Sequence, residues 1–198
     1  MRKVCLIRHG ATAANEKRLY YGATDLSVSE NGRKELEKLR EKGGYPDISG
    51  FAVYTSGMKR TAETLDILYP ETKYSVEAEL SEMNFGKFEM RAYEELQYDP
   101  EYQKWIEGDY LKNVCPDGES ACQHAERAVR GFNRVLNEVT GNILMICHGG
   151  TIASVMMSLF PTEGEDRWYW DCANGCGYEV EFDGLKPVSY KKLPFLQE

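Results

Sequence analysis

Two of the three histidines in this chain follow apolar runs that are typical of buried strands. Arg8-His9-Gly10 comes directly after residues 4–7, and His148-Gly149-Gly150 comes directly after residues 143–147. Open α/β sheets bind ligands beside the carboxyl ends of their strands, so both imidazoles are expected in one cleft. A histidine nucleophile next to an arginine, with a second histidine opposite, is suited to attack on a phosphoryl group.

Other side chains that suit this chemistry also follow expected strands. Arg60 lies in the first turn of the helix expected after residues 51–54, and Glu82 follows a weak strand that begins near Val76. If these strands are parallel neighbours, their ends meet at the same edge of the sheet. The expected cleft therefore contains Arg8, His9, Arg60, Glu82 and His148.

Each of these residue types has a role in phosphoryl transfer. Two arginines supply bidentate donors for a phosphate dianion, and nearby glycines let backbone N–H groups approach it. A neutral His9 imidazole can take the phosphoryl group, while His148 and the arginines stabilise charge on the equatorial oxygens. Glu82 can protonate the leaving alkoxide and then deprotonate the attacking water.

Length, charge and cysteine content narrow the class of protein. The 198 residues are expected to form a single domain over 1–198. The net charge of -8 argues against nucleic acid or an anionic membrane surface as a partner. Neither a membrane span nor a signal peptide is expected. Six cysteines occur without a C-x-x-C pair, which argues against a zinc site and favours the reducing cytoplasm.

The apolar pattern predicts an alternation of strands and helices. Strands are expected over residues 2–8, 51–54 and 142–147, with an edge strand over 178–182 and a weak strand from Val76. Helices are expected from the capping box Ser27–Glu30 through Lys42, from a Ser56 cap through Leu68, over 119–139 and over 151–160. This alternation predicts an α/β fold with a mostly parallel sheet and helices on both faces. Residues 15–24 are expected to form a loop, and residues 85–117 a lid of short helices and loop.

At this point the sequence resembles the histidine phosphatase superfamily, also called the phosphoglycerate mutase-like family. The resemblance is carried by five signatures in the family's order: Arg8-His9-Gly10-Ala11-Thr12 with Asn15, Thr55-Ser56 with Arg60-Thr61-Ala62, Leu80-Ser81-Glu82 before Phe85-Gly86, Pro116-Asp117-Gly118-Glu119-Ser120, and His148-Gly149-Gly150. It implies a three-layer α/β/α sandwich, no required metal and no cofactor.

The resemblance also implies roles for single residues. His9 is expected to be the phosphorylated nucleophile, and Glu82 the proton donor. Arg8, Arg60 and His148 are expected to bind the phosphate, with Asn15 as an accessory contact. The expected substrate pocket includes Tyr21, Thr24 and Phe85, and other aromatic residues, namely Tyr20, Tyr93 and Trp105, could line it as well. His124, on the long helix, is expected to be a surface or packing residue.

Three functions remain open at this stage: a phosphomonoester hydrolase, a phosphoglycerate mutase and a phosphate-binding protein without turnover. The bisphosphoglycerate-dependent mutases that this family includes are typically longer after the proton donor. Here residues 85–117 contain few cations, namely Lys87, Arg91, Lys104 and Lys112, among many carboxylates. This charge pattern favours hydrolysis of a small phosphorylated metabolite. Residues 22–27 and 82–89 are similar to the α-ribazole phosphatase branch, but the substrate and the oligomeric state stay open.

Overall fold

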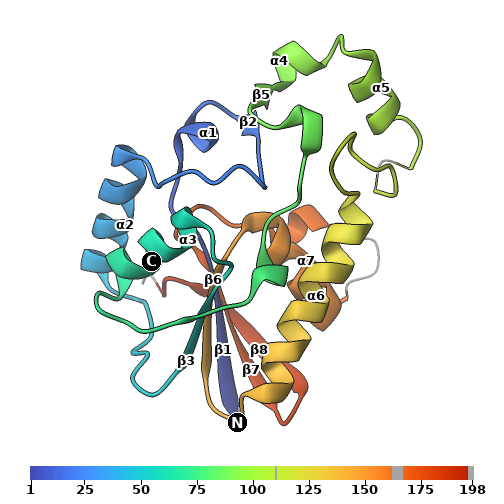
Figure 1. Ribbon diagram of the computed structural model, residues 1–198. Helices are drawn as coiled ribbons and strands as arrows, with labels where there is room; N and C mark the ends of the chain where they lie inside the picture. The colour runs from blue at the N-terminus through green and yellow to red at the C-terminus, as the bar shows by residue number, and fades with distance from the viewer. Residues whose placement is uncertain (110, 162–166, 196–198) are drawn as a thin grey trace.

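A six-stranded sheet forms the centre of the computed structural model, which describes residues 1–109, 111–161 and 167–195 (Figure 1). In spatial order the strands are β4 (Ser75–Val76), β3 (Ala52–Thr55), β6 (Ile143–Cys147), β1 (Arg2–Arg8), β7 (Gly177–Asp183) and β8 (Lys186–Leu193). The first four run parallel, whereas β7 and β8 pair antiparallel. The predicted mostly parallel sheet is confirmed.

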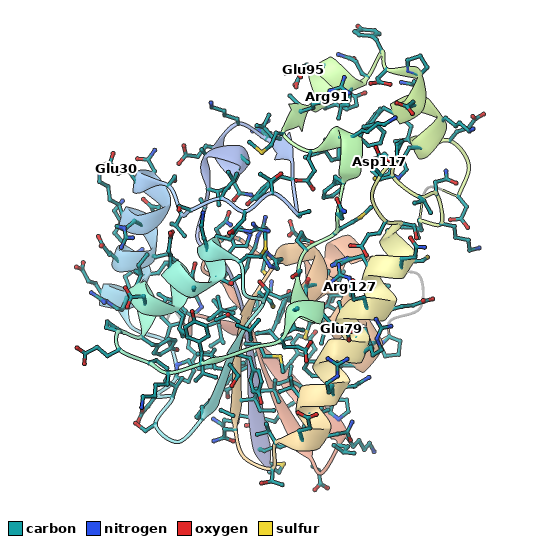
Figure 2. The ribbon with its side chains drawn as sticks, viewed as in Figure 1. Glu30, Glu79, Arg91, Glu95, Asp117 and Arg127 are labelled. Atoms are coloured by element: carbon teal, nitrogen blue, oxygen red, sulfur yellow. The ribbon has the colours of Figure 1, made fainter. Side chains whose placement is uncertain are left out.

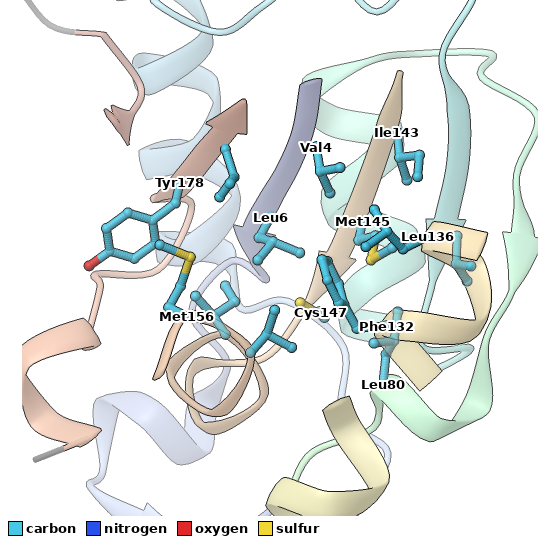
Figure 3. Packing of buried hydrophobic residues seen from close by; sticks show 14 of the residues in the cluster. Val4, Leu6, Leu80, Phe132, Leu136, Ile143, Met145, Cys147, Met156 and Tyr178 are labelled. Atoms are coloured by element: carbon cyan, nitrogen blue, oxygen red, sulfur yellow. The ribbon is translucent and has the colours of Figure 1, made fainter. Parts of the chain in front are cut away.

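Helices cover both faces of the sheet and complete a three-layer sandwich (Figure 1). One face packs against α2 (Glu30–Lys42) and α3 (Lys59–Leu68), and the other against α6 (Ala121–Glu138) and α7 (Gly149–Leu159). In β1, Val4 and Leu6 join the α6/α7 core, which Figure 3 shows, while Cys5 and Ile7 join the α2/α3 core. Both faces of β1 and β6 are buried, which explains their continuous apolar runs.

The lid forms a separate layer above the carboxyl ends of the parallel strands (Figure 1). Its elements are η2 (Gly86–Phe88), β5 (Arg91–Ala92), α4 (Tyr93–Leu96) and α5 (Pro100–Ile106). Figure 2 shows Arg91 and Glu95 at the end of the molecule that lies far from the sheet. The lid has a small apolar core of its own, formed by Met83, Phe88, Leu96, Tyr102, Cys115 and Ala121. Short helices in this segment were expected from the sequence.

Four short elements complete the described chain. α1 (Ala13–Glu16) and β2 (Leu19–Tyr20) occupy part of the segment that was expected to be loop, and β2 pairs antiparallel with β5 of the lid. η1 (Ala78–Leu80) precedes Glu82, and η3 (Arg167–Trp170) precedes β7. None of the helices in the described ranges is both long and apolar enough to span a bilayer.

Two predicted helix starts are wrong, and tertiary contacts explain both. Ser29 rather than Ser27 caps α2, because Val28 is held extended in a bridge with Thr12. The Ser29 hydroxyl accepts a hydrogen bond from the N–H of Gly32. α3 begins at Lys59 without a side-chain cap, because the Ser56 hydroxyl bonds to His148.

The strand at residues 178–182 is not an edge strand, since β7 lies between β1 and β8. The alternation with Glu179 and Glu181 suggested a face open to solvent. Instead, Glu179 is 1% exposed and pairs with Lys3 of β1 and Lys191 of β8 at 3.0 and 3.2 Å. Because the buried carboxylate of Glu179 is paired, the interior strand β7 can have the alternating apolar and polar residues that are typical of an edge strand.

Candidate active site

The ends of β1 and β6 bring the two strand-end histidines together. The ring centroids of His9 and His148 are 5.1 Å apart, with an interplanar angle of 61°. A cavity of about 500 Å³ opens beside them, below the lid. Its lining includes five of the predicted polar side chains: Arg8, His9, Asn15, Arg60 and Glu82.

The His9 imidazole is neutral, with its proton on one defined nitrogen. Its Nδ1 is 2.8 Å from the carbonyl oxygen of Gly10, which can only accept, so Nδ1 carries the proton and Nε2 has the lone pair. Burial, together with the charges of Arg60 and Arg8, lowers the pKa of His9 to about 3. The imidazole is therefore uncharged near neutral pH, as a nucleophile must be.

Arg8 presents a cation at the cavity with part of its donor set engaged. Its Nη1 donates to the carbonyl of Cys172 at 2.6 Å and contacts Asp171 at 3.3 Å. Its Nε is buried and has no hydrogen-bond partner among the described residues. Gly149 packs on the guanidinium, and a Cβ there would lie 3.1 Å from Cζ of Arg8. Glycine at 149 therefore lets the start of α7 approach this cation.

Arg60 is fully buried, and the loop at residues 22–24 fixes its guanidinium. Nη1 donates to the carbonyl of Thr24 at 2.9 Å, and Nη2 to the carbonyl of Gly22 at 2.7 Å. The Arg60 guanidinium also lies over the Tyr21 ring, with Cζ 5.0 Å from the ring centroid, which adds a cation–π contact. The cation is thus positioned before any ligand arrives, which lowers the cost of ordering it on binding.

A hydrogen-bond chain holds both ring nitrogens of His148. Arg60 donates from Nε to Nδ1 at 3.3 Å, so the proton of the neutral ring lies on Nε2, which is 2.8 Å from the Ser56 hydroxyl. That hydroxyl is in turn 3.2 Å from the Thr61 hydroxyl, which donates to the carbonyl of Met58. Burial and Arg60 hold the pKa of His148 well below its usual range.

His148 was expected to bind the phosphate, but its side chain does not face the cavity. The ring has no exposed surface and lies behind the residues that line the cavity. Because Nδ1 accepts from Arg60, a neutral His148 fixes this arginine, and it can donate to a phosphate only if Nδ1 gains a proton. Ser56, which sequence analysis assigned to a helix cap, is the residue whose hydroxyl accepts the Nε2 proton of this tautomer.

Glu82 lines the cavity and is held by backbone donors. Its Oε1 accepts from its neighbour's N–H, that of Met83, and its Oε2 accepts from the N–H of Gly150 at the start of α7, both at 2.9 Å. The side chain is 16% exposed. The protein therefore presents this carboxyl group to the cavity in a fixed orientation.

The remaining predicted residues divide into two groups. Asn15, Tyr21 and Phe85 line the cavity, whereas Thr24 does not. The side-chain carbonyl of Asn15 accepts from the Tyr21 hydroxyl at 2.7 Å and from the N–H of Thr12 at 3.0 Å. The amide N–H₂ group is therefore the part of this side chain that can donate to a ligand. Thr24 contributes its backbone carbonyl to Arg60 instead of a side chain to the pocket.

The side of the cavity under the lid is largely aromatic. The wall consists of Tyr20, Tyr21, Phe85, Tyr102 and Trp105, together with Leu19, Met83 and Ile106. Tyr20 meets Phe85 and Trp105 edge-to-face, with centroid distances of 5.4 and 6.2 Å. Tyr93 is not part of the lining and packs on Tyr102 instead. Such a wall favours an apolar or flat group on the ligand.

Glu89 is a site residue that sequence analysis did not single out. Its carboxylate accepts hydrogen bonds from five donors: the N–H groups of Gly22, Ala23, Thr24 and Phe85, and the Thr24 hydroxyl. Through the loop at 22–24 it supports the carbonyls that hold Arg60. The only sequence signal was its place at the end of the family-like stretch 82–89.

No group of three or more histidine, cysteine, aspartate or glutamate side chains is arranged to hold a metal ion in the part of the chain that the structure describes. All six cysteines are free thiols.

Comparison with known proteins finds relatives that align over most of the chain. An adenosylcobalamin/alpha-ribazole phosphatase of Escherichia coli is 27% identical over 186 residues, which cover 91% of this chain and 90% of that protein. A 2,3-bisphosphoglycerate-dependent phosphoglycerate mutase of Cytophaga hutchinsonii is 27% identical over 205 residues, which cover 96% of this chain and 93% of the mutase. Because that mutase aligns over nearly its whole length, chain length does not separate hydrolases from mutases here.

Comparison with solved structures also finds an alpha-ribazole phosphatase. The crystal structure of the alpha-ribazole phosphatase from Shigella flexneri matches with a TM-score of 0.82 at 26% identity, over 94% of this chain and 93% of that one. The family model of the histidine phosphatase superfamily, branch 1, matches residues 4–191. This chain is therefore a member of branch 1 of the histidine phosphatase superfamily.

Proposed function

We propose that the protein hydrolyses a phosphomonoester of a small metabolite through a phosphohistidine on His9. The observation that carries the proposal is the neutral His9 imidazole, with its proton on Nδ1 and Nε2 available, between two fixed arginines. A buried neutral imidazole can attack phosphorus, and Arg8 and Arg60 supply N–H donors for the charge that spreads over the phosphoryl oxygens.

The reaction has two in-line steps. His9 Nε2 attacks phosphorus, the bond from phosphorus to the ester oxygen breaks, and Glu82 gives its proton to that oxygen so that an alcohol leaves. A water molecule then attacks the phosphohistidine, Glu82 takes a proton from it, and the N–P bond breaks. Inorganic phosphate is released, His9 is neutral again and Glu82 is protonated again.

The charge around the cavity favours hydrolysis over mutase chemistry. Among the described residues that line the cavity, the cations are Arg8 and Arg60. Three of the four lid cations pair with carboxylates: Lys87 with Glu101, Arg91 with Asp99, and Lys112 with Asp109. The fourth, Lys104, is not part of the cavity lining. A bisphosphate needs further cations to offset the desolvation of its second phosphate. The mutase remains the alternative, because the Cytophaga hutchinsonii relative carries that name.

The aromatic wall supports an alcohol with a flat or apolar group. A cavity of about 500 Å³ has room for a nucleoside-sized alcohol besides the phosphate. α-Ribazole phosphate, which carries a flat base, is therefore one candidate substrate, and the names of the Escherichia coli and Shigella flexneri relatives agree with it. We further infer a cytoplasmic location, since six free thiols suit a reducing compartment.

The decisive experiment follows the phosphoryl group. Wild-type protein incubated with labelled substrate and quenched in base is expected to carry an acid-labile label, and His9→Ala is expected to lose both this label and turnover of p-nitrophenyl phosphate. Lys59→Ala, at an exposed position beside Arg60, serves as the control and keeps both. Turnover retained by His9→Ala would refute the assignment.

A second assay separates hydrolase from mutase. The protein is incubated with 3-phosphoglycerate, with and without 2,3-bisphosphoglycerate, and the release of phosphate is compared with isomerisation. Phosphate release without cofactor dependence is expected. Cofactor-dependent isomerisation that outruns hydrolysis would replace the hydrolase with the mutase. A panel of phosphomonoesters that includes α-ribazole phosphate then ranks the candidate alcohols.

A further inference from the structure

His124 is a buried histidine directly behind Glu82. It lies on α6 with 0% of its surface exposed, and its Nε2 is 3.4 Å from Oε1 of Glu82 and 3.2 Å from the Thr151 hydroxyl oxygen. It is not part of the cavity lining. The sequence analysis expected His124 to be a surface or packing residue. Its contact with Glu82, the proposed acid–base group, was not expected.

The surrounding hydrogen bonds determine which nitrogen of His124 carries a proton. The Thr151 hydroxyl lies 3.2 Å from the carbonyl oxygens of both Leu80 and Ser81, and a carbonyl can only accept. The hydroxyl proton is therefore directed there, and its oxygen accepts from His124. Nε2 must then be the protonated nitrogen, and the same N–H faces the carboxylate of Glu82.

This N–H makes the two oxygens of Glu82 unequal. Oε1 meets the N–H of Met83 at 2.9 Å and Nε2 of His124 at 3.4 Å, while Oε2 accepts from the N–H of Gly150 at 2.9 Å. A proton on Oε1 would point at one of the two N–H groups already there. A proton on this carboxyl group is thus placed on Oε2.

We propose that His124 is a positioning residue for the reaction, which holds Glu82 so that Oε2 gives the proton to the leaving oxygen and later takes one from water. The inference rests on the proposed function, because it needs Glu82 to act as acid and base. His124 contacts neither the substrate nor His9; it acts through Glu82.

The backbone of this turn is held by a different residue. Arg127, one turn further along α6, donates to the carbonyls of Glu79, Ser81 and Glu82 at 2.8, 3.0 and 3.2 Å (Figure 2). Arg127 anchors the main chain directly, whereas His124 contacts the carboxyl group directly and the main chain only through Thr151. Loss of His124 is therefore expected to change proton transfer more than binding.

The test compares esters that differ in their need for a proton. Phenyl phosphate has a poor leaving group that depends on protonation, whereas p-nitrophenyl phosphate loses a stable anion. In His124→Leu, the ratio of kcat/KM for phenyl phosphate to that for p-nitrophenyl phosphate is expected to fall about tenfold. His124→Gln places an amide N–H near Nε2 and is expected to keep this ratio within about threefold of the wild type.

Phe132→Leu is the matched control for damage to α6. Phe132 is fully buried on the same helix and packs on Phe182, with ring centroids 6.4 Å apart. This variant is expected to lose stability and to keep the wild-type ratio of the two esters. Equal ratios in His124→Leu and the wild type, or equal loss in His124→Leu and His124→Gln, would overturn the inference.

A spectroscopic measurement covers the case in which His124→Leu does not fold. With three histidines in the chain, ¹⁵N-detected imidazole spectra contain three ring systems. His124 is expected in the Nε2–H form, and its signals are expected to shift in the isosteric variant Glu82→Gln but not in Phe132→Leu. An Nδ1–H form of the His124 ring, or a His124 ring that does not respond to Glu82→Gln, would also overturn the inference.

The kinetic data also separate this inference from the proposed function. If Glu82→Gln leaves the ratio of the two esters unchanged, Glu82 is not the acid and the proposed mechanism fails. If Glu82→Gln lowers the ratio but His124→Leu does not, the mechanism stands and only the role of His124 is refuted.

Discussion

Glu89 is expected to control both the stability of the protein and the position of Arg60. One carboxylate accepts from four backbone N–H groups and one hydroxyl, and three of these N–H groups belong to Gly22, Ala23 and Thr24. The carbonyls of Gly22 and Thr24 bind the Arg60 guanidinium on the other side of the same loop. A change at Glu89 therefore reaches Arg60, in the proposed phosphate site, through this loop.

The size of the effect follows from the substitution Glu89→Gln. The amide keeps one oxygen, but its N–H₂ group replaces the other oxygen and faces donors. With the N–H₂ at the Oε2 position, the N–H of Thr24 loses its acceptor, while the Thr24 hydroxyl can rotate away. An orphaned buried donor costs about 1–3 kcal/mol, and the remaining bonds lose their charge assistance. Because Glu89 is only partly buried, we expect a loss of about 2 kcal/mol in the free energy of unfolding.

Thermal and urea unfolding measure this loss. For a chain of this size, about 2 kcal/mol corresponds to a fall in Tm of roughly 4–8 °C. The loosened loop leaves Arg60 less ordered, so kcat/KM for p-nitrophenyl phosphate is expected to fall about tenfold. Both effects should appear together, since they arise from the same loop.

Glu63→Gln is the matched control. Its carboxylate accepts a single bond, from the N–H of Val28 at 2.7 Å, and the amide oxygen of glutamine can replace that acceptor. It is expected to shift Tm by less than about 2 °C and to leave kcat/KM unchanged. If Glu89→Gln behaves like this control in both assays, the reasoning about the loop is refuted.

Three further predictions concern the site. Burial, Arg60 and Arg8 hold the pKa of His9 at about 3, so between about pH 6.5 and 3 the unfolded chain binds a proton that the folded chain does not, and stability falls as pH drops through this window. Between pH 7 and pH 5, the free energy of unfolding of His9→Asn is expected to fall by about 2 kcal/mol less than that of the wild type, as measured by urea titration. If the free energy of unfolding falls equally with pH in both proteins, the lowered pKa of His9 is contradicted. Ser56→Ala removes the partner of His148 Nε2 and is expected to lower kcat/KM about tenfold, whereas activity within about twofold of the wild type would show that the tautomer is fixed without Ser56. Trp105→Ala is expected to raise KM for an aromatic ester more than for a small alkyl ester, and an equal change for both would remove Trp105 from the alcohol site.

The sequence predicted the main sheet well, because its strands are buried on both faces. The runs at 2–8 and 142–147 became β1 and β6, and their parallel pairing placed His9 and His148 at one edge. The rules for helix caps failed where a residue far away in the chain competed for the capping side chain. The Ser56 hydroxyl has the position of a helix cap, but its partner is His148, 92 residues away in the chain.

The polar residues that support the site were harder to predict for the same reason. Glu89 acts on a loop 65–67 residues earlier, and no local motif indicates that contact. For His124 a signal existed: it lies four and eight residues before Ala128 and Phe132, which are on the buried face of α6. A histidine at that helical spacing indicates burial, but not which group it meets.

The lid has its own apolar cluster, separate from the two clusters that stabilise the sheet. Phe88, Leu96 and Tyr102 pack among themselves, while Phe85 and Trp105 rest on that cluster and line the cavity. Mutations that remodel the lid can therefore accumulate without disturbing the strands that carry the two imidazoles. Under the proposed function, the residues at the strand ends can then act on different alcohols, while lid residues that line the cavity set the selectivity.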